Sequence, residues 1–142
     1  MVLKNEQLTA KIIRVYYDVY NELGHGFLEA VYERSMTLAL KDAGLKAEPQ
    51  AAIPVMFRGQ VVGEYRADIL VENEVLVELK AVRSLAAEHY AQVIHYLRAT
   101  SFEIGLLFNF GSRPTFKRFL FDNPSKKIRV NPCESVANWG SQ

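Results

Sequence analysis

The sequence contains few of the features that mark secreted, membrane-bound or cross-linked proteins. Its single cysteine, Cys133, excludes an internal disulfide and cannot by itself form a thiolate metal site. No apolar run approaches the ~18 residues that a membrane span needs, and the N-terminal residues lack the apolar centre and cleavage site of a secretory signal. Repeats and low-complexity segments are also missing. We therefore expect a cytoplasmic protein with no membrane partner.

The net charge of +1 is distributed unevenly along the chain. Residues 1–112 carry a net charge of −3, whereas residues 113–131 carry +5. A basic cluster can attract a phosphate backbone, but a solvated surface strand is the commoner explanation, so the cluster alone favours nucleic acid only weakly. The candidate nucleic-acid-binding residues are Arg113, Lys117, Arg118, Lys126, Lys127 and Arg129.

The length of 142 residues and a hydrophobic content of 49% predict one globular domain over residues 1–132, followed by a tail at 133–142. Apolar spacing predicts helices at about 5–23, 26–43 and 85–100, and strands at 51–57, 61–71, 75–82, 103–110 and 115–121, with a short edge strand at 126–130. The order ααβββαββ is typical of a mixed α/β domain with helices packed on a central sheet.

Several local features support these boundaries. We expect Asn5 to cap the first helix and Ser84 the third, and Gly24 and Gly44 to end the first two helices. Two prolines, at positions 49 and 54, indicate that strand 51–57 lies at a sheet edge. The buried side of the second helix is expected to carry Leu28, Val31, Tyr32, Ser35, Met36 and Ala39.

The hairpin at 61–82 is where chemistry is expected. Its two strands are apolar enough to be covered on both faces, yet Asp68, Glu78 and Lys80 interrupt them. Because side chains alternate along a strand, Glu78 and Lys80 project from one face. Charges in such a place are costly unless they are paired or bind a metal.

The length of the hairpin loop decides whether Asp68 joins this face. A two-residue loop would place it opposite to Glu78, whereas a three-residue loop at 72–74 pairs residue 71 with 75 and therefore 68 with 78. We predict the three-residue loop, because it brings together two carboxylates suited to Mg²⁺ or Mn²⁺. The simpler alternative is an ordinary ion pair between Glu78 and Lys80.

Three further polar residues lie on predicted helices. Glu29 shares a broad face with Gly26 and Tyr32, although a partly exposed first-turn acid favoured by the helix dipole is the simpler explanation. Gln92 and Tyr96 lie one turn apart, and they either face Lys80 or form a buried tyrosine with an amide partner.

The segment Gly26-Phe27-Leu28-Glu29-Ala30-Val31-Tyr32, followed in order by Asp68, Glu78-Leu79-Lys80 and Gln92-x-x-x-Tyr96, resembles the GxxExxY proteins. These bacterial and archaeal chains are grouped with the PD-(D/E)XK nuclease superfamily. The resemblance covers nearly the whole chain and implies a restriction-endonuclease-like core. The residue before Asp68 is Ala67 where the superfamily motif has proline, which weakens the motif match more than the chemistry.

The resemblance also implies roles for individual residues. Asp68 and Glu78 would be the metal carboxylates, Glu29 the helical acid and Lys80 the motif lysine, while Gln92 and Tyr96 match the QxxxY element of RecB-like nucleases. With the Leu79 carbonyl, the acids would hold Mg²⁺ or Mn²⁺, and Lys80 would orient water or stabilise charge.

We therefore expect a metal-dependent nuclease that hydrolyses phosphodiester bonds, with DNA favoured over RNA as the partner and a homodimer as one conceivable assembly. Two alternatives stay open at this point. One is a non-catalytic module that keeps the nuclease fold and binds nucleic acid or protein, and the other is an oligomeric structural or toxin-associated component.

Overall fold

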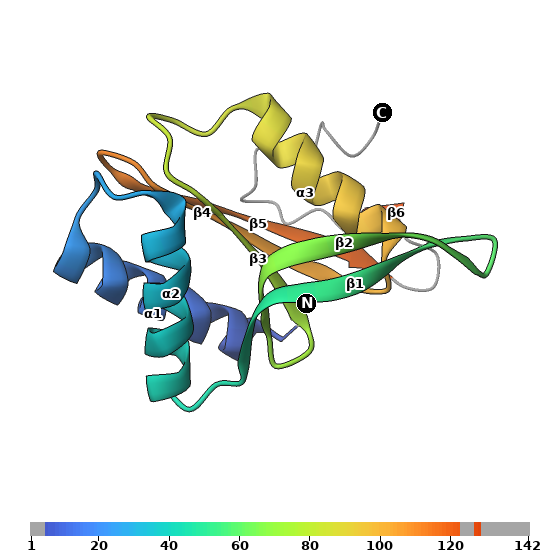
Figure 1. Cartoon of the computed structure of the whole chain (residues 1–142), viewed down its shortest axis with the longest axis horizontal. Helices are drawn as coiled ribbons and strands as arrows, with labels where there is room; N and C mark the ends of the chain where they lie inside the picture. Colours follow the sequence, from blue (N-terminus) through green and yellow to red (C-terminus); the bar gives the residue numbers. More distant parts are fainter. Residues whose placement is uncertain (1–4, 123–126, 129–142) are drawn as a thin grey trace.

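The computed structural model describes residues 5–122 and 127–128 of the chain. Two helices are followed by a three-stranded meander, a third helix and a second group of strands (Figure 1). The elements are α1 Glu6–Leu23, α2 Glu29–Asp42, β1 Ala47–Phe57, β2 Gln60–Val71, β3 Val75–Lys80, α3 Ala87–Ala99, β4 Ile104–Phe110, β5 Pro114–Asp122 and β6 Lys127–Ile128. The predicted order ααβββαββ is confirmed, and β6 follows it as a two-residue strand within the predicted segment 126–130.

In the described part of the chain, the strands form one mixed sheet in the order β1-β2-β3-β4-β5-β6. Only β3 and β4 are parallel, and α3 connects them, as a parallel pair requires a crossover. The other neighbours are antiparallel. The position of β1 at the edge confirms the interpretation of its two prolines, since an edge strand has one side without ladder partners.

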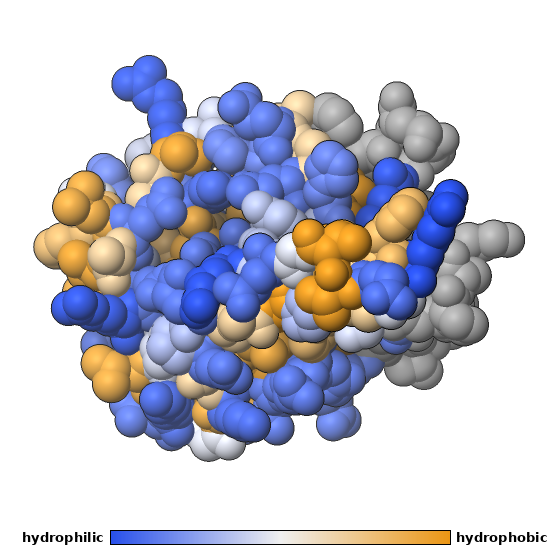
Figure 2. Space-filling view, turned by 45° about the vertical axis from the view of Figure 1, so that its right-hand side comes forward, coloured by the Kyte–Doolittle hydropathy of each residue, from blue (hydrophilic) through white to orange (hydrophobic). Residues whose placement is uncertain are grey.

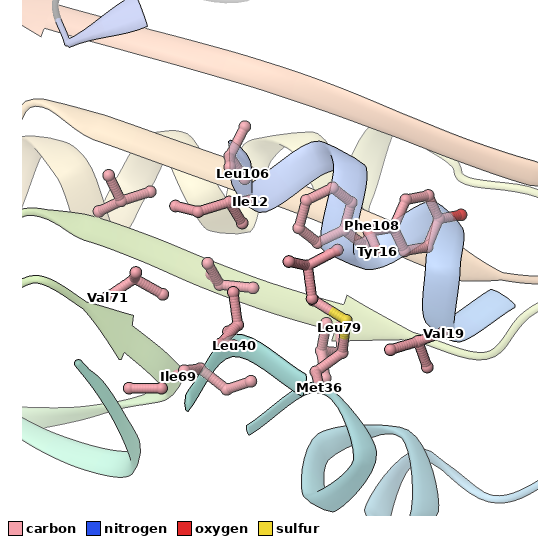
Figure 3. Packing of buried hydrophobic residues seen from close by; sticks show 14 of the residues in the cluster. Ile12, Tyr16, Val19, Met36, Leu40, Ile69, Val71, Leu79, Leu106 and Phe108 are labelled. Atoms are coloured by element: carbon pink, nitrogen blue, oxygen red, sulfur yellow. The ribbon is translucent and has the colours of Figure 1, made fainter. Parts of the chain in front are cut away.

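Helices cover both faces of the sheet (Figure 1), and the side of the molecule drawn in Figure 2 is mostly hydrophilic, with scattered hydrophobic side chains. α1 and α2 pack on one face, where Ile12, Tyr16, Met36 and Leu40 are fully buried against β2, β3 and β4 (Figure 3). α3 packs on the other face through Val93, Ile94 and Leu97. The two apolar clusters hold β2 and β3 between them, which explains why these strands are apolar on both sides.

Three predictions about the helices are wrong in detail. α2 begins at Glu29 and not at Gly26, so Leu28 precedes the helix and is 81% exposed. Val31 is exposed as well, because the buried face of α2 consists of Tyr32, Met36, Thr37 and Leu40. α3 begins at Ala87, so Ser84 lies in the preceding turn and does not cap it.

The first helix follows the prediction more closely. Asn5 occupies the N-cap position of α1, but its side chain makes no capping bond and donates instead to Glu74 Oε2 at 2.5 Å. Gly24 ends the helix with a φ of 69°, a conformation that glycine adopts without strain. No helix in the described part of the chain is both long and apolar enough to cross a membrane. The predicted tail at 133–142, which includes Cys133, lies outside the described residues.

Candidate active site

The candidate site lies where β2 and β3 separate. β2 pairs with β3 over only three residue pairs, from Val71 with Val75 to Ile69 with Val77. β2 continues along β1, whereas β3 stays paired with β4 as far as Lys80. The pairing of Val71 with Val75 confirms the three-residue loop at 72–74. Asp68 and Glu78 are therefore the residues at which the two strands part, and we call this place the acidic fork.

Each carboxylate of the acidic fork accepts a backbone hydrogen bond from the opposite strand. The Asp68 N–H donates to Glu78 Oε2 at 3.1 Å, and the Leu79 N–H donates to Asp68 Oδ2 at 2.8 Å. These side chains replace the carbonyls that a continuing ladder would supply, so the backbone groups stay paired where the strands diverge. The same bonds fix the positions of both carboxylates and use only one oxygen of each.

Burial makes both carboxylates hard to ionise. Glu78 is 6% exposed, and its desolvation, with the nearby charge of Asp68, raises the pKa of its carboxyl to about 7. Desolvation also raises the pKa of Asp68, and the charges of Glu33 and Glu29 add to this effect, although the Leu79 N–H and Lys80 oppose it. The acidic fork thus holds negative charge that a cation would stabilise.

Lys80 lies on the same pocket as both acids, as the alternation along β3 predicts. Among the described residues, no carboxylate oxygen lies within 4.0 Å of its ammonium group, so the alternative of an ordinary ion pair with Glu78 is not observed. Its charge still lowers the pKa of both carboxyls from a distance. Lys80 is therefore placed beside the acids without being neutralised by either.

Glu29 reaches this pocket because of the loop that precedes α2. Gly26 has a φ of 113°, which side chains disfavour, and it allows the sharp approach to the helix. The Tyr32 hydroxyl donates to the Gly24 carbonyl at 2.6 Å and accepts from the Phe27 N–H at 3.3 Å. The buried tyrosine therefore anchors the loop at both ends, and Glu29, the first residue of α2, lines the pocket.

The QxxxY pair supports Glu78 through a residue that sequence reasoning missed. Gln92 Nε2 donates to the Tyr96 hydroxyl at 3.1 Å, and the Tyr96 ring stacks on Tyr65, with ring centroids 3.5 Å apart. The Tyr65 hydroxyl in turn donates to Glu78 Oε2. Burial and the charge of Glu78 raise the pKa of Tyr65, so this hydroxyl stays protonated as a donor. No bond from Gln92 or Tyr96 to Lys80 is found among the described residues.

Glu33 is a second residue that sequence reasoning missed. It lies one turn after Glu29 on the face of α2 that looks toward the acidic fork, and its charge raises the pKa of Asp68 more than that of Glu29 does. Its Oε1 accepts a 2.6 Å bond from Gln50 Nε2, which ties α2 to β1. The spacing of Glu29 and Glu33, one helical turn apart, is the only signal in the sequence that could have indicated it.

The acids and their supporting residues, apart from Glu33, line a pocket of about 450 Å³. The lining consists of Glu29, Val55, Glu64, Tyr65, Arg66, Asp68, Glu78, Lys80, Gln92 and Tyr96. Every side chain that was predicted to take part in catalysis or metal binding is thus found on one pocket. Within the described residues, however, no group of three or more His, Cys, Asp or Glu side chains is close enough to hold a metal ion. Glu29 therefore does not complete a three-carboxylate cluster with Asp68 and Glu78 in this conformation.

The comparison with protein families agrees with this geometry. The sequence profile of the PD-(D/E)XK nuclease superfamily matches residues 6–119, which include the acidic fork and all three helices. The chain belongs to the PD-(D/E)XK nuclease superfamily. A search among curated proteins finds no match.

Among solved structures, the chain is similar to the crystal structure of SSO0001, with 22% sequence identity and a TM-score of 0.49. The match covers 63% of this chain and 49% of the other, so the chain spans about half the length of that protein.

The sequence at the acidic fork resembles the motif that names the superfamily. Glu78-Leu79-Lys80 has the form (D/E)XK, and Asp68 precedes it, with Ala67 in the position where the motif has proline. Divalent metals are typical of the superfamily. The donor set fits such an ion, because two neighbouring carboxylates offer oxygen atoms of the kind that Mg²⁺ and Mn²⁺ prefer, and a cation would offset the cost of ionising both.

Of the predicted basic residues, those with described side chains lie outside the acidic pocket. Arg113 and Lys117 line a different pocket, and Arg118 lies on β5 with a buried Nε that has no hydrogen-bond partner among the described residues. Lys126 and Arg129 lie outside the described residues, and of Lys127 the structure describes only the backbone, in β6. None of the three described side chains lines the acidic pocket.

Proposed function

We propose that the acidic fork binds Mg²⁺ or Mn²⁺ and hydrolyses phosphodiester bonds in nucleic acid, with DNA as the favoured substrate. The observation that carries this proposal is the pair of carboxylates, Asp68 and Glu78, each held by a backbone N–H of the opposite strand and both on the same pocket as Lys80. A structural ion pair would not need such an arrangement, because it would neutralise Glu78 with Lys80.

In this proposal, each residue of the pocket has a defined task. Asp68, Glu78 and the Leu79 carbonyl would hold the metal ion, and Glu29 would ligate it directly or through water. The bound ion would lower the pKa of water and polarise the phosphoryl oxygens. Lys80, which no carboxylate of the described residues neutralises, would orient the attacking water or stabilise the negative charge that develops on the phosphate.

A chain of contacts behind Glu78 supports this assignment. Tyr65 donates to Glu78 and so keeps one carboxylate oxygen engaged and oriented. Tyr96 stacks on Tyr65, and Gln92 bonds Tyr96, so the pair would act on the metal site through Tyr65. Each is a positioning residue in this scheme, because within the described part of the chain none of the three makes a hydrogen bond to Asp68 or Lys80.

We also propose that the chain is a GxxExxY protein within the superfamily. The support is that each named position of that motif has a separate structural task. Gly26 adopts the positive φ of the loop, Glu29 begins α2 at the pocket, and Tyr32 anchors the loop by two hydrogen bonds.

A cleavage assay tests the proposed function. Fluorescently labelled single-stranded and duplex DNA and RNA would be incubated with the protein in Mg²⁺ or Mn²⁺ and in EDTA. We expect metal-dependent cleavage that Asp68→Asn and Lys80→Ala each reduce by at least about 100-fold, the scale of losing one electrostatic contact in a transition state. The matched controls are Asp18→Asn and Lys41→Ala, both exposed helix positions.

The result that would remove the proposal is cleavage that survives Asp68→Asn or that persists in EDTA. A protein that binds DNA but cleaves none of these substrates in either metal would instead be a binding module that retains the nuclease fold.

A further inference from the structure

A second pocket lies at the carboxyl end of β3 and has the opposite electrostatic character. Its volume is about 490 Å³, and it shares no lining residue with the acidic pocket. Three cations, Arg83, Arg113 and Lys117, and three aromatic residues, Tyr17, Tyr90 and Phe116, line it, and no acidic residue does. The remaining lining residues are three with hydroxyl groups and one leucine. We call it the basic pocket.

The three cations of the basic pocket come from three separate segments. Arg83 follows β3, Arg113 lies in the turn between β4 and β5, and Lys117 lies on β5. Arg83 and Arg113 are exposed, and within the described part of the chain neither forms an ion pair with a carboxylate. Converging like charges repel one another, so the basic pocket is suited to an anion that interacts with several of them at once.

The aromatic residues of the basic pocket add a second kind of contact. Tyr17 on α1 is 36% exposed, and its ring meets Phe116 edge-on at 6.3 Å between centroids. The Lys117 ammonium lies 5.8 Å from the centre of the Tyr90 ring. Flat apolar surfaces beside cations bind ligands that combine a planar ring with an anion. A volume of about 490 Å³ is also in the ordinary range of pockets for small organic ligands.

A nucleotide is the ligand that combines these properties. Its phosphate would contact the arginines, and its base would stack on an exposed ring. Bases within a duplex are already stacked and paired, whereas a concave pocket lined with aromatic rings admits an unpaired base. We propose that the basic pocket binds a phosphorylated nucleotide with an unpaired base, either as a free mononucleotide or as the end of a single strand, with Arg83 and Arg113 on the phosphate and Tyr17 on the base.

This site goes beyond the proposed hydrolysis, since it needs neither a metal ion nor the acidic fork. It also bears on where a substrate would lie. Lys80 lines the acidic pocket and Arg83 the basic pocket, and three residues of extended chain span at most about 11 Å. A single strand whose terminal nucleotide occupies the basic pocket would therefore pass close to the acidic fork.

Binding measured by calorimetry with the full chain in EDTA tests this site separately from cleavage. The ligands are dTMP, inorganic phosphate, a 5′-phosphorylated single-stranded hexamer, the same hexamer without its phosphate, and a phosphorylated duplex. We expect wild type to bind dTMP or the phosphorylated hexamer saturably, and the dephosphorylated hexamer and the duplex at least about tenfold more weakly. If dTMP binds as tightly as the phosphorylated hexamer, a free nucleotide is sufficient as the ligand. If the phosphorylated hexamer binds more tightly than dTMP, the ligand is the end of a single strand.

Three variants and one control connect the binding to the basic pocket. Arg83→Gln and Arg113→Gln should each weaken binding at least about tenfold and reduce its salt dependence. Tyr17→Leu should weaken the binding of dTMP but leave that of inorganic phosphate unchanged. The matched control is Arg58→Gln, an exposed arginine in the turn between β1 and β2. Thermal unfolding verifies that each variant folds.

Several results would overturn the proposal. The first is that neither dTMP nor the phosphorylated hexamer binds saturably. The second is that both arginine variants bind these ligands as tightly as the Arg58→Gln control does. The third is that the dephosphorylated hexamer binds as tightly as the phosphorylated one, or that the duplex binds more tightly than the single strand. Cleavage data do not enter this test, so nucleotide binding can fail while the nuclease proposal stands, and the reverse also holds.

Discussion

Replacing Glu78 by glutamine should make the metal-free protein more stable at neutral and alkaline pH, although the change removes a proposed metal ligand. Glu78 is 6% exposed, and burial with the charge of Asp68 raises the pKa of its carboxyl to about 7. Glutamine has nearly the same shape and no charge. Its carbonyl oxygen can still accept the hydrogen bonds that Tyr65 and the Asp68 N–H now donate to Oε2.

The size of the effect follows from the pKa. A carboxyl whose pKa rises from 4.5 to about 7 on folding costs about 3 kcal/mol of stability when it is ionised in both states. Because the folded state binds the proton more tightly than the unfolded state, this cost is absent below pH 4.5 and complete above pH 7. Wild type should therefore lose stability across this range, whereas Glu78→Gln should not show that part of the loss.

Urea unfolding in EDTA at pH 5, 6.5 and 8 measures this difference. We expect Glu78→Gln to exceed wild type by ~1–3 kcal/mol at pH 8 and by much less at pH 5. The control is Glu48→Gln, at an exposed position of β1, which should track wild type. If Glu78→Gln were less stable than wild type at pH 8, or if the difference were the same at pH 5, the claim of a destabilising buried charge would be refuted.

Manganese should narrow or reverse this difference. At a concentration of 100 times its Kd, a bound ion stabilises the folded state by about 2.7 kcal/mol. Wild type should gain this stability at pH 8, and Glu78→Gln should gain much less because it lacks the ligand charge. An equal gain in both proteins would mean that Glu78 is not part of a metal site.

Three further changes test the surroundings of the site. The hydrogen bond from the Tyr65 hydroxyl lowers the pKa of the Glu78 carboxyl, so Tyr65→Phe should raise that pKa. Stability in EDTA should therefore fall by ~1–2 kcal/mol more at pH 8 than at pH 5. Gly111→Ala would place a Cβ 2.5 Å from the Val82 carbonyl and 2.8 Å from Asn109 Nδ2, and should lower the free energy of unfolding by ~1–3 kcal/mol. Tyr16→Phe leaves the carbonyls of Asn109 and Thr115 without their buried donor and should cost ~1–3 kcal/mol in urea unfolding. A loss below ~0.5 kcal/mol in either of the last two would show that the contact adds little to stability.

The register of the β2–β3 hairpin could be predicted because local chemistry decides it. Glu72 and Asn73 both have a positive φ, of 52° and 53°, as a short loop between paired strands requires. Once the loop length is three residues, the pairing of Val71 with Val75 and the approach of Asp68 to Glu78 follow from the alternation of strands. The prediction of two facing acids therefore depended on a few neighbouring residues only.

The role of Tyr65 could not be predicted in this way. Strict alternation would place Tyr65 and Ala67 on the same face as Ile69 and Val71, under α1 and α2. In the structure Tyr65 and Ala67 pack in the cluster under α3, whereas Ile69 and Val71 stay in the other cluster. β2 thus changes face at Asp68.

The cause of this change lies partly in another strand. Gln50, on β1 opposite Asp68, has a positive φ of 52°, and the pairing between Pro49 with Ile69 and Ala51 with Ala67 is interrupted at this point. The hydrophobic pattern of β2 alone contains no sign of this break. A local cause explains why Leu28 was wrongly assigned to the buried side of α2, since the loop anchored by Tyr32 delays the start of the helix until Glu29.

The carboxylates of the acidic fork also hold the strands in place, and this affects how mutations there should be interpreted. Asp68 accepts the Leu79 N–H and Glu78 accepts the Asp68 N–H, at the point where β2 and β3 no longer pair. An alanine at either position would leave a partly buried N–H without its acceptor and would free the strands to move, whether or not a metal binds there. Loss of cleavage in an alanine variant would therefore not separate the two roles. Amide variants keep an acceptor oxygen at each N–H and remove only the charge, so their effect on metal-dependent activity reports on the chemistry of the site.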